Sequence, residues 1–146
     1  RWIMSRKRPN KENNLKSGDK LVDWLFKRLM DAADKKVVGL KFKKIAGKKI
    51  KKVGKNYEAD GDLGRTYLFF GYPDIKSDIE IEYRMSKRSK GRVFMHELMH
   101  VLFKQNVRRE KYIRQLENYL WPRLCEEQKQ EFIKKAHLLR DESRLH

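Results

Sequence analysis

Residues 93–103 of this 146-residue chain read Val93-Phe94-Met95-His96-Glu97-Leu98-Met99-His100-Val101-Leu102-Phe103. The apolar residues recur at the spacing of an α-helix, and Gln105-Asn106 follows as its end. On such a helix His96 and His100 lie one turn apart on one face, so both imidazoles can bind one metal ion. Glu97 lies beside that face and can reach a water molecule on the ion as a general base. The stretch therefore predicts a zinc site.

A purely structural interpretation competes with this one. Two histidines at the edge of a core can be hydrogen-bonded to carboxylates without any metal. Against it, Glu97 beside two histidines would be an unfavourable buried charge if no cation lay near.

Zinc hydrolases use three protein ligands and one water molecule, so a third ligand must come from elsewhere in the chain. The metzincin extension of the motif needs glycine at 103 and histidine at 106, and the chain has Phe103 and Asn106 there. That class is excluded, and a carboxylate from the next helix is the other common arrangement.

Glu110 and Glu117 are the acids of that next helix, seven residues apart and so on nearly the same face. A short link at residues 106–107 would bring the helix back beside the first. The level of His100 would then be met about two turns into it, which favours Glu117 as the third ligand and Glu110 as its substitute. Either acid could instead pair with neighbouring Arg or Lys, and His137 is a weaker candidate.

The flanking patterns predict an N-terminal helix and several strands. Helical spacing covers residues 19–34, behind a possible N-cap at residues 17–19. Val38, Leu40 and Phe42 alternate with glycine and lysine, which predicts a strand with one basic, solvated face. Further strands are expected over residues 50–57, irregularly, and over 66–70.

The segment before the motif reads as a strand and a basic loop. In residues 78–83, Ile79, Ile81 and Tyr83 alternate with acids, a pattern typical of an edge or near-edge strand. Residues 85–92 are expected to be a loop. Two more helices are predicted at 108–124, kinked or ended by Pro122, and at 126–139.

These elements predict an α+β fold, and its zincin-like form is implied by a resemblance of residues 91–102 to zincin metallopeptidases. It would have an N-terminal helix, a small, mostly antiparallel twisted sheet, the HExxH helix and two helices after it. We expect one domain over residues 18–146, preceded by a flexible basic arm at residues 1–17. The single cysteine, Cys125, excludes an internal disulfide and suits a reducing compartment. No apolar run approaches the ~20 residues of a membrane span. Together these features predict a cytoplasmic, intracellular protein, and they leave its oligomeric state open.

The net charge of +17 is the second informative feature of the chain. It is concentrated at residues 6–20, 35–55 and 84–92, and predicts a polyanionic partner such as nucleic acid or a nucleoprotein, bound through phosphates without sequence preference. A solvated lysine face is the alternative. The candidate contacts are Lys43, Lys44, Lys48, Lys49, Lys51, Lys52, Lys87, Arg88, Lys90 and Arg92.

Residues 91–102, which contain the motif, resemble the active helix of gluzincin-type zincin metallopeptidases. More narrowly, they resemble the small intracellular ones of phages and bacteria, including the ImmA/IrrE-like group and its short phage relatives. The element order over residues 47–124 is similar too. The resemblance implies zinc on His96 and His100, Glu97 as base and a helix-borne Glu as third ligand. The basic surface and the arm depart from the usual small zincin.

A mechanism follows from the motif. Zinc lowers the pKa of its water, Glu97 accepts the proton, and the resulting hydroxide attacks a peptide carbonyl polarised by the metal. The strand at residues 78–83 would hold an extended peptide as an added strand. Tyr112, Tyr119 and Arg84 are candidates for stabilising the oxyanion.

Three function classes are compatible with the sequence. The first is a zinc peptidase acting on a protein, including one held on nucleic acid. The second is a zincin-fold structural or binding component of a nucleoprotein or phage particle, with or without metal. The third and least favoured is a nuclease, because a glutamate beside a zinc-binding histidine pair suits peptide hydrolysis better.

Overall fold

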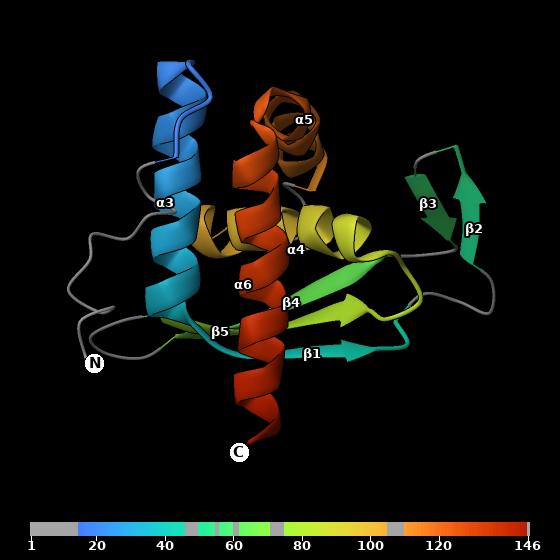
Figure 1. The fold of residues 1–146 in the computed structure, drawn as a ribbon. Coiled ribbons are helices and arrows are strands. Elements are labelled where there is room, and N and C mark those ends of the chain that lie inside the picture. The colour runs from blue at the N-terminus through green and yellow to red at the C-terminus, as the bar shows by residue number, and fades with distance from the viewer. Residues whose placement is uncertain are drawn as a thin grey trace, which may run out of the picture.

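The structure, a computed structural model, describes residues 15–45, 50–54, 56–59, 62–70, 75–104 and 110–145. Within these residues the fold is α+β, with four α-helices and a small mixed sheet (Figure 1). The elements are α3 (Lys20–Lys36), β1 (Val37–Lys43), β2 (Ile50–Val53), β3 (Asn56–Ala59), β4 (Gly64–Phe70), β5 (Ile75–Glu82), α4 (Lys87–Phe103), α5 (Glu110–Leu120), the 3₁₀ turn η2 (Trp121–Arg123) and α6 (Glu126–Arg144).

The main sheet has the strand order β1-β5-β4, with β5 parallel to β1 and antiparallel to β4. The strands β2 and β3 form a separate antiparallel hairpin, which Figure 1 shows to the side of the sheet. The expectation of a mostly antiparallel sheet is therefore corrected to a mixed one. The prediction of an edge or near-edge strand at residues 78–83 holds only in its near-edge form, because β5 is the middle strand of three and is hydrogen-bonded on both sides. It cannot accept a peptide as a further strand, whereas β4 lies at an edge of the sheet.

The inward faces of the strands differ from the predicted ones at two positions. A register shift in β1 between Val37 and Gly39 turns Val37 into the core and leaves Val38 59% exposed, although Leu40 is buried as predicted. On β5, Ile79 and Ile81 are fully buried as predicted, but Tyr83 follows the strand and is half exposed.

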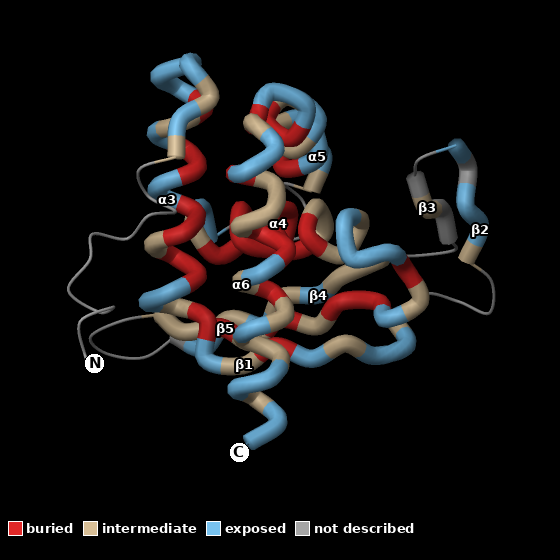
Figure 2. Tube along the Cα trace, viewed as in Figure 1, coloured by how far each residue is buried: buried red, intermediate tan, exposed pale blue. Residues whose placement is uncertain are grey.

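Helix α4 forms the centre of the molecule, and nearly all of its middle is buried (Figure 2). It begins at Lys87 after the N-cap Ser86, so residues 87–92 are helical and the predicted loop is confined to a shorter segment. At Gly91 helix α6 crosses so closely that a Cβ would lie 2.4 Å from Cγ1 of Ile133. Helix α4 ends at Phe103, where Lys104 takes a left-handed conformation with φ 53°.

The start of the described chain is attached to the helices. Asp19 caps α3 by accepting hydrogen bonds from two backbone N–H groups, which confirms the predicted cap. Asp23 accepts hydrogen bonds from Ser17 and from Gln128 of α6, and Gln128 also donates to the carbonyl of Leu15. Residues 15–17 of the predicted arm are thus held against α3 and α6, while the rest of that arm lies outside the described residues. No helix in the described part of the chain is long and apolar enough to cross a membrane.

Candidate metal centre

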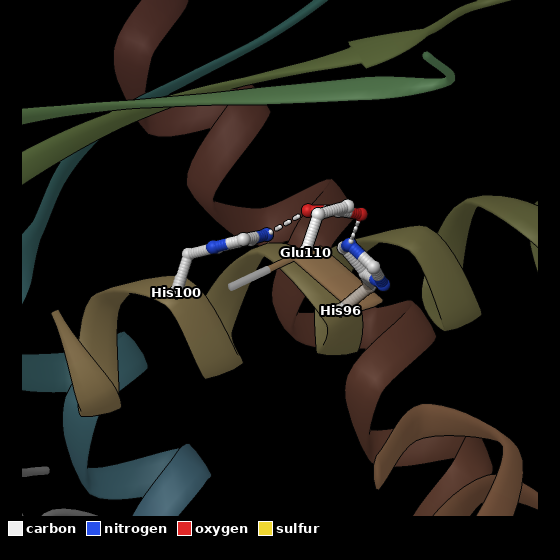
Figure 3. Close-up of side chains that lie close together, drawn as sticks. All are labelled: His96, His100 and Glu110. Atoms are coloured by element: carbon white, nitrogen blue, oxygen red, sulfur yellow. Dashed lines mark hydrogen bonds and ion pairs between the residues drawn. The ribbon is translucent and has the colours of Figure 1, made fainter. Parts of the chain in front are cut away.

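Helix α4 and the first turn of α5 bring two imidazoles and one carboxylate together (Figure 3). The Glu110 carboxylate lies between the histidines, with Oε1 2.6 Å from Nε2 of His96 and Oε2 2.7 Å from Nε2 of His100. One ligand atom from each residue lies within 4.8 Å of the others. The two histidines lie on one face of α4, as predicted, because they are four positions apart on the helix and both rings contact the Glu110 carboxylate.

Glu117 holds the opposite side of the His96 ring. Its Oε1 lies 2.7 Å from Nδ1 of His96, and its Oε2 accepts a hydrogen bond from Nε of Arg92. Arg92 also donates to Asn118 through a terminal nitrogen, at 2.8 Å. The side chain of Glu117 therefore orients the imidazole so that Nε2 faces Glu110 and His100.

Glu110, and not Glu117, is the acid that lies with both histidines in a group that could hold a metal ion. The reasoning from the interhelical link failed because α4 ends only three residues after His100 and α5 begins at Glu110 itself. The first turn of α5 therefore already lies at the level of the histidines. Both glutamates do face α4, as their seven-residue spacing predicted.

Glu97 follows His96 on α4, and its side chain lies against the edge strand β4. Its Oε1 accepts a hydrogen bond of 2.7 Å from the hydroxyl of Thr66. A Cβ at Gly64 would lie 2.9 Å from Oε2 and 2.7 Å from a methyl of Val93, so only glycine lets β4 approach this closely. Two residues of β4 thus fix where the Glu97 carboxylate can be.

Negative charge dominates the surroundings of His96. Burial disfavours the charged imidazole, but the Glu117 hydrogen bond and the charges of Glu97, Glu117 and Glu110 outweigh burial and raise the pKa of His96. Burial also raises the pKa of Glu97, against the opposing charge of His96 and the hydrogen bond from Thr66. For Glu117, hydrogen bonds to His96 and Arg92 overcome burial and lower the pKa. A cation at this centre would relieve the excess negative charge.

The donor set fits a zinc ion on chemical grounds. Two histidines and one glutamate are a known ligand set of catalytic zinc, which keeps a further position open for water. A hydrogen bond from the second nitrogen of a ligand histidine to a carboxylate is also typical of such sites, and Glu117 supplies it. A divalent cation would replace the protons that link the imidazoles to Glu110.

The other predicted site residues lie elsewhere. Tyr112 is 60% exposed on α5, and the ring of Tyr119 is covered by Arg123, with 4.0 Å from its guanidinium carbon to the ring centroid. Arg84 is bound through Nε to Glu82 at 2.8 Å. These positions do not support a role for any of the three side chains as an oxyanion donor. Nδ1 of His137 donates to the carbonyl of Ile133 on α6, and His137 is not part of the three-residue cluster.

The predicted phosphate contacts also separate into groups. Lys43 pairs with Glu80 and Arg88 with Glu126, and Arg92 belongs to the metal centre. Lys44, Lys51, Lys52 and Lys87 are exposed, and Lys90 is half-buried. Lys48 and Lys49 lie outside the described residues.

Three residues of the centre were not found by reasoning from sequence. Arg92 precedes His96 by four residues and so shares its face, a spacing that could have revealed it. Thr66 and Gly64 carry no local signal, because only the packing of β4 on α4 brings them to Glu97.

No protein-family model, curated protein or solved structure gave a significant match to this chain.

Proposed function

We propose that this protein is a zinc-dependent peptidase of the small zincin type. The observation that carries the proposal is the convergence of His96, His100 and Glu110 beside the buried carboxylate of Glu97. Either feature alone would be compatible with a structural role. Their combination is the ligand set and the base that hydrolysis of a peptide bond requires.

Each residue has one role in this proposal. His96 and His100 would hold the ion through Nε2, with Glu110 as the third ligand and Glu117 orienting His96. Zinc supplies Lewis acidity, which polarises a peptide carbonyl and acidifies a water molecule. Glu97 would accept the proton of the attacking water and later pass it to the leaving amine. Thr66 acts as a positioning residue, since it fixes Oε1 of Glu97 and leaves Oε2 to move the proton.

The substrate would lie along β4 and not along β5. Strand β4 is at an edge of the sheet, and through Thr66 it is in direct contact with Glu97. An extended peptide pairing with that edge would be held by main-chain hydrogen bonds, with little demand on its sequence. The residues along β4 that face outward include Tyr67, 44% exposed, and Phe69, 49% exposed, which could contact apolar side chains of the peptide.

The test is hydrolysis of an unfolded protein such as reduced casein by the zinc-loaded chain, by the chelator-treated chain and by Glu97→Gln. We expect cleavage by the zinc-loaded chain alone, with a loss of about 10²-fold or more in Glu97→Gln while its zinc content is unchanged. Glu127→Gln, an exposed glutamate at the start of α6, is the matched control and should cleave normally.

Full activity in Glu97→Gln would refute the assigned base. Zinc bound at one ion per chain with no cleavage of any unfolded substrate would instead favour the second candidate, a zincin-fold component of a nucleoprotein. The strongly basic composition is the observation that favours this candidate.

A further inference from the structure

A cluster of cations lies on Phe42, away from the metal centre. Phe42 is half-buried on β1, with Nζ of Lys90 4.9 Å and the guanidinium carbon of Arg140 4.8 Å from its ring centroid. His137 meets the same ring edge-on at 5.1 Å between centroids. Lys87 lies one turn before Lys90 on α4. We call Phe42, Lys87, Lys90, His137 and Arg140 the Phe42 cluster.

Three elements that are far apart in sequence build this cluster. Strand β1 supplies the ring, the N-terminal part of α4 supplies the two lysines, and α6, which crosses both (Figure 1), supplies Arg140 and His137. The backbone N–H of Leu40 donates to Ser143, which fixes the end of α6 against β1. The cluster is therefore a rigid feature of the fold and not a run of lysines on one mobile segment.

In the described part of the chain, Arg140 is the one cation of the cluster that forms an ion pair, with the neighbouring Asp141 at 2.8 Å. Among the described residues, no acid forms an ion pair with Lys87 or Lys90. The pKa of Lys90 is lowered by burial and then by the positive charges of Arg140 and Lys87, with Glu82 opposing them. Glu82 itself is bound to Arg84. Lys90 is thus partly buried beside two other positive charges, and a bound anion would relieve the repulsion between them.

The geometry of Arg140 suits a phosphate group. Its Nε donates to Asp141 at 2.8 Å, and its guanidinium carbon lies against the Phe42 ring. Stacking on an aromatic ring restrains the guanidinium while its terminal nitrogens keep the fork that binds phosphate oxygens in pairs. Lys44, exposed just after β1 and two residues beyond Phe42, adds a positive charge at this end of the strand.

We propose that the Phe42 cluster binds the phosphodiester backbone of a nucleic acid. Lysines are depleted at the centres of protein–protein interfaces, whereas phosphate backbones are bound mainly through lysine and arginine. The aromatic ring is covered by cations and not exposed for insertion, so base stacking and sequence reading are not part of the proposal. This inference is independent of the proposed peptidase function.

The test compares two triple variants of equal charge. Lys87→Gln, Lys90→Gln and Arg140→Gln together remove the cluster, while Lys20→Gln, Lys27→Gln and Lys111→Gln remove three exposed lysines from α3 and α5. Binding of labelled single-stranded DNA, RNA and duplex DNA is measured at two or more salt concentrations. We expect the cluster variant to lose at least about ten-fold more affinity than the control, and its log–log salt slope to fall by roughly 2 to 3.

Equal losses in the two variants would overturn the proposal, because binding would then be diffuse electrostatic attraction. So would the absence of binding by the wild-type chain at low salt. Competition by polyglutamate as effective as that by oligonucleotide, or cluster-dependent binding to phosphatidylserine vesicles without nucleic-acid binding, would assign the cluster to an acidic protein or to a membrane instead. His96→Ala should bind nucleic acid like the wild type, which separates this result from the fate of the metal centre.

Discussion

Glu110 and Glu117 show how two carboxylates about two turns apart on one helix face can make different contacts. Both face α4, but Glu110 meets Nε2 of His96 and His100, whereas Glu117 meets Nδ1 of His96. A single imidazole cannot present both nitrogens to the same ion. In the proposed zinc site, Glu110 would therefore be a ligand and Glu117 would orient a ligand.

Substituting the two glutamates should separate these roles. Glu110→Gln should lose stoichiometric zinc, since a neutral amide is a poor ligand for a cation that two imidazoles alone would have to hold. Glu117→Gln should keep one zinc per chain but bind it about 10- to 100-fold more weakly. Competition with a chromogenic chelator measures both. The reverse order of effects would return the ligand role to Glu117.

Thr66 offers a second test at the level of single residues. Its hydroxyl donates to Glu97 over 2.7 Å, and a hydrogen bond to a charged group contributes roughly 1.5–3 kcal/mol. If Glu97 is the base, Thr66→Val should lower the rate of hydrolysis about ten-fold or more with unchanged zinc content. Thr66→Ser, which keeps the hydroxyl, should restore most of the rate. An equal loss in both variants would indicate packing of β4 and not positioning of Glu97.

At the scale of elements, the sequence predicted most helices and failed where tertiary contacts decide. Helical spacing located α3, α4 and α6 because each buries a continuous apolar face. The loop expected at residues 85–92 is helical because Ser86 caps it and Gly91 lets α6 approach. Alternating acids such as Glu80 suggest an edge or near-edge strand, and only the pairing of β5 with both β1 and β4 shows that it is the middle strand.

In the candidate site, too, local spacing predicts some residues and tertiary packing decides the others. His96, Glu97 and His100 are read from local spacing, because the helix itself sets their relative positions. Glu110 was ranked second because the level of α5 depends on where α4 ends, and Lys104 ends it earlier than the apolar pattern suggested. Thr66 could not be predicted at all, since its place beside Glu97 depends on the packing of a distant strand.

Asp23 ties together the elements that enclose α4. Its carboxylate accepts hydrogen bonds from Ser17 and Gln128. Burial alone would raise the pKa of Asp23, but these hydrogen bonds and those from nearby backbone N–H groups outweigh burial and lower the pKa from 3.8. Because the folded carboxyl has the lower pKa, its stabilisation is fully present above pH 3.8 and is lost as the pH falls through the folded-state value.

The substitution Asp23→Asn should therefore destabilise the protein by about 1–2 kcal/mol at neutral pH, because Ser17 and Gln128 lose a charged acceptor. The difference from the wild type should shrink as the pH drops below 3.8. Urea unfolding at several pH values measures this, with Asp31→Asn on the same helix as comparison. A difference independent of pH would mean that the carboxylate charge is not what the network stabilises.

At the scale of the whole molecule, the metal centre and the Phe42 cluster share one scaffold. Helix α4 carries Lys87 and Lys90 near its start and His96 and His100 further on, so the two sites lie along one rigid rod. If nucleic acid binds at the Phe42 cluster, a second protein carried on that nucleic acid would lie within reach of the candidate metal centre. The composition alone predicted an anionic partner. Which of the many lysines and arginines lie close together depends on the packing of β1, α4 and α6, and could not be predicted from the sequence.

Zinc stoichiometry, measured by native mass spectrometry, decides whether His96, His100 and Glu110 form one zinc site. The wild-type chain should bind one zinc ion, and so should His137→Ala, whose histidine lies on Phe42 outside the centre. His96→Ala, with its fold verified by circular dichroism, should retain no stoichiometric zinc. One zinc ion per chain in folded His96→Ala would show that His96 is not a zinc ligand.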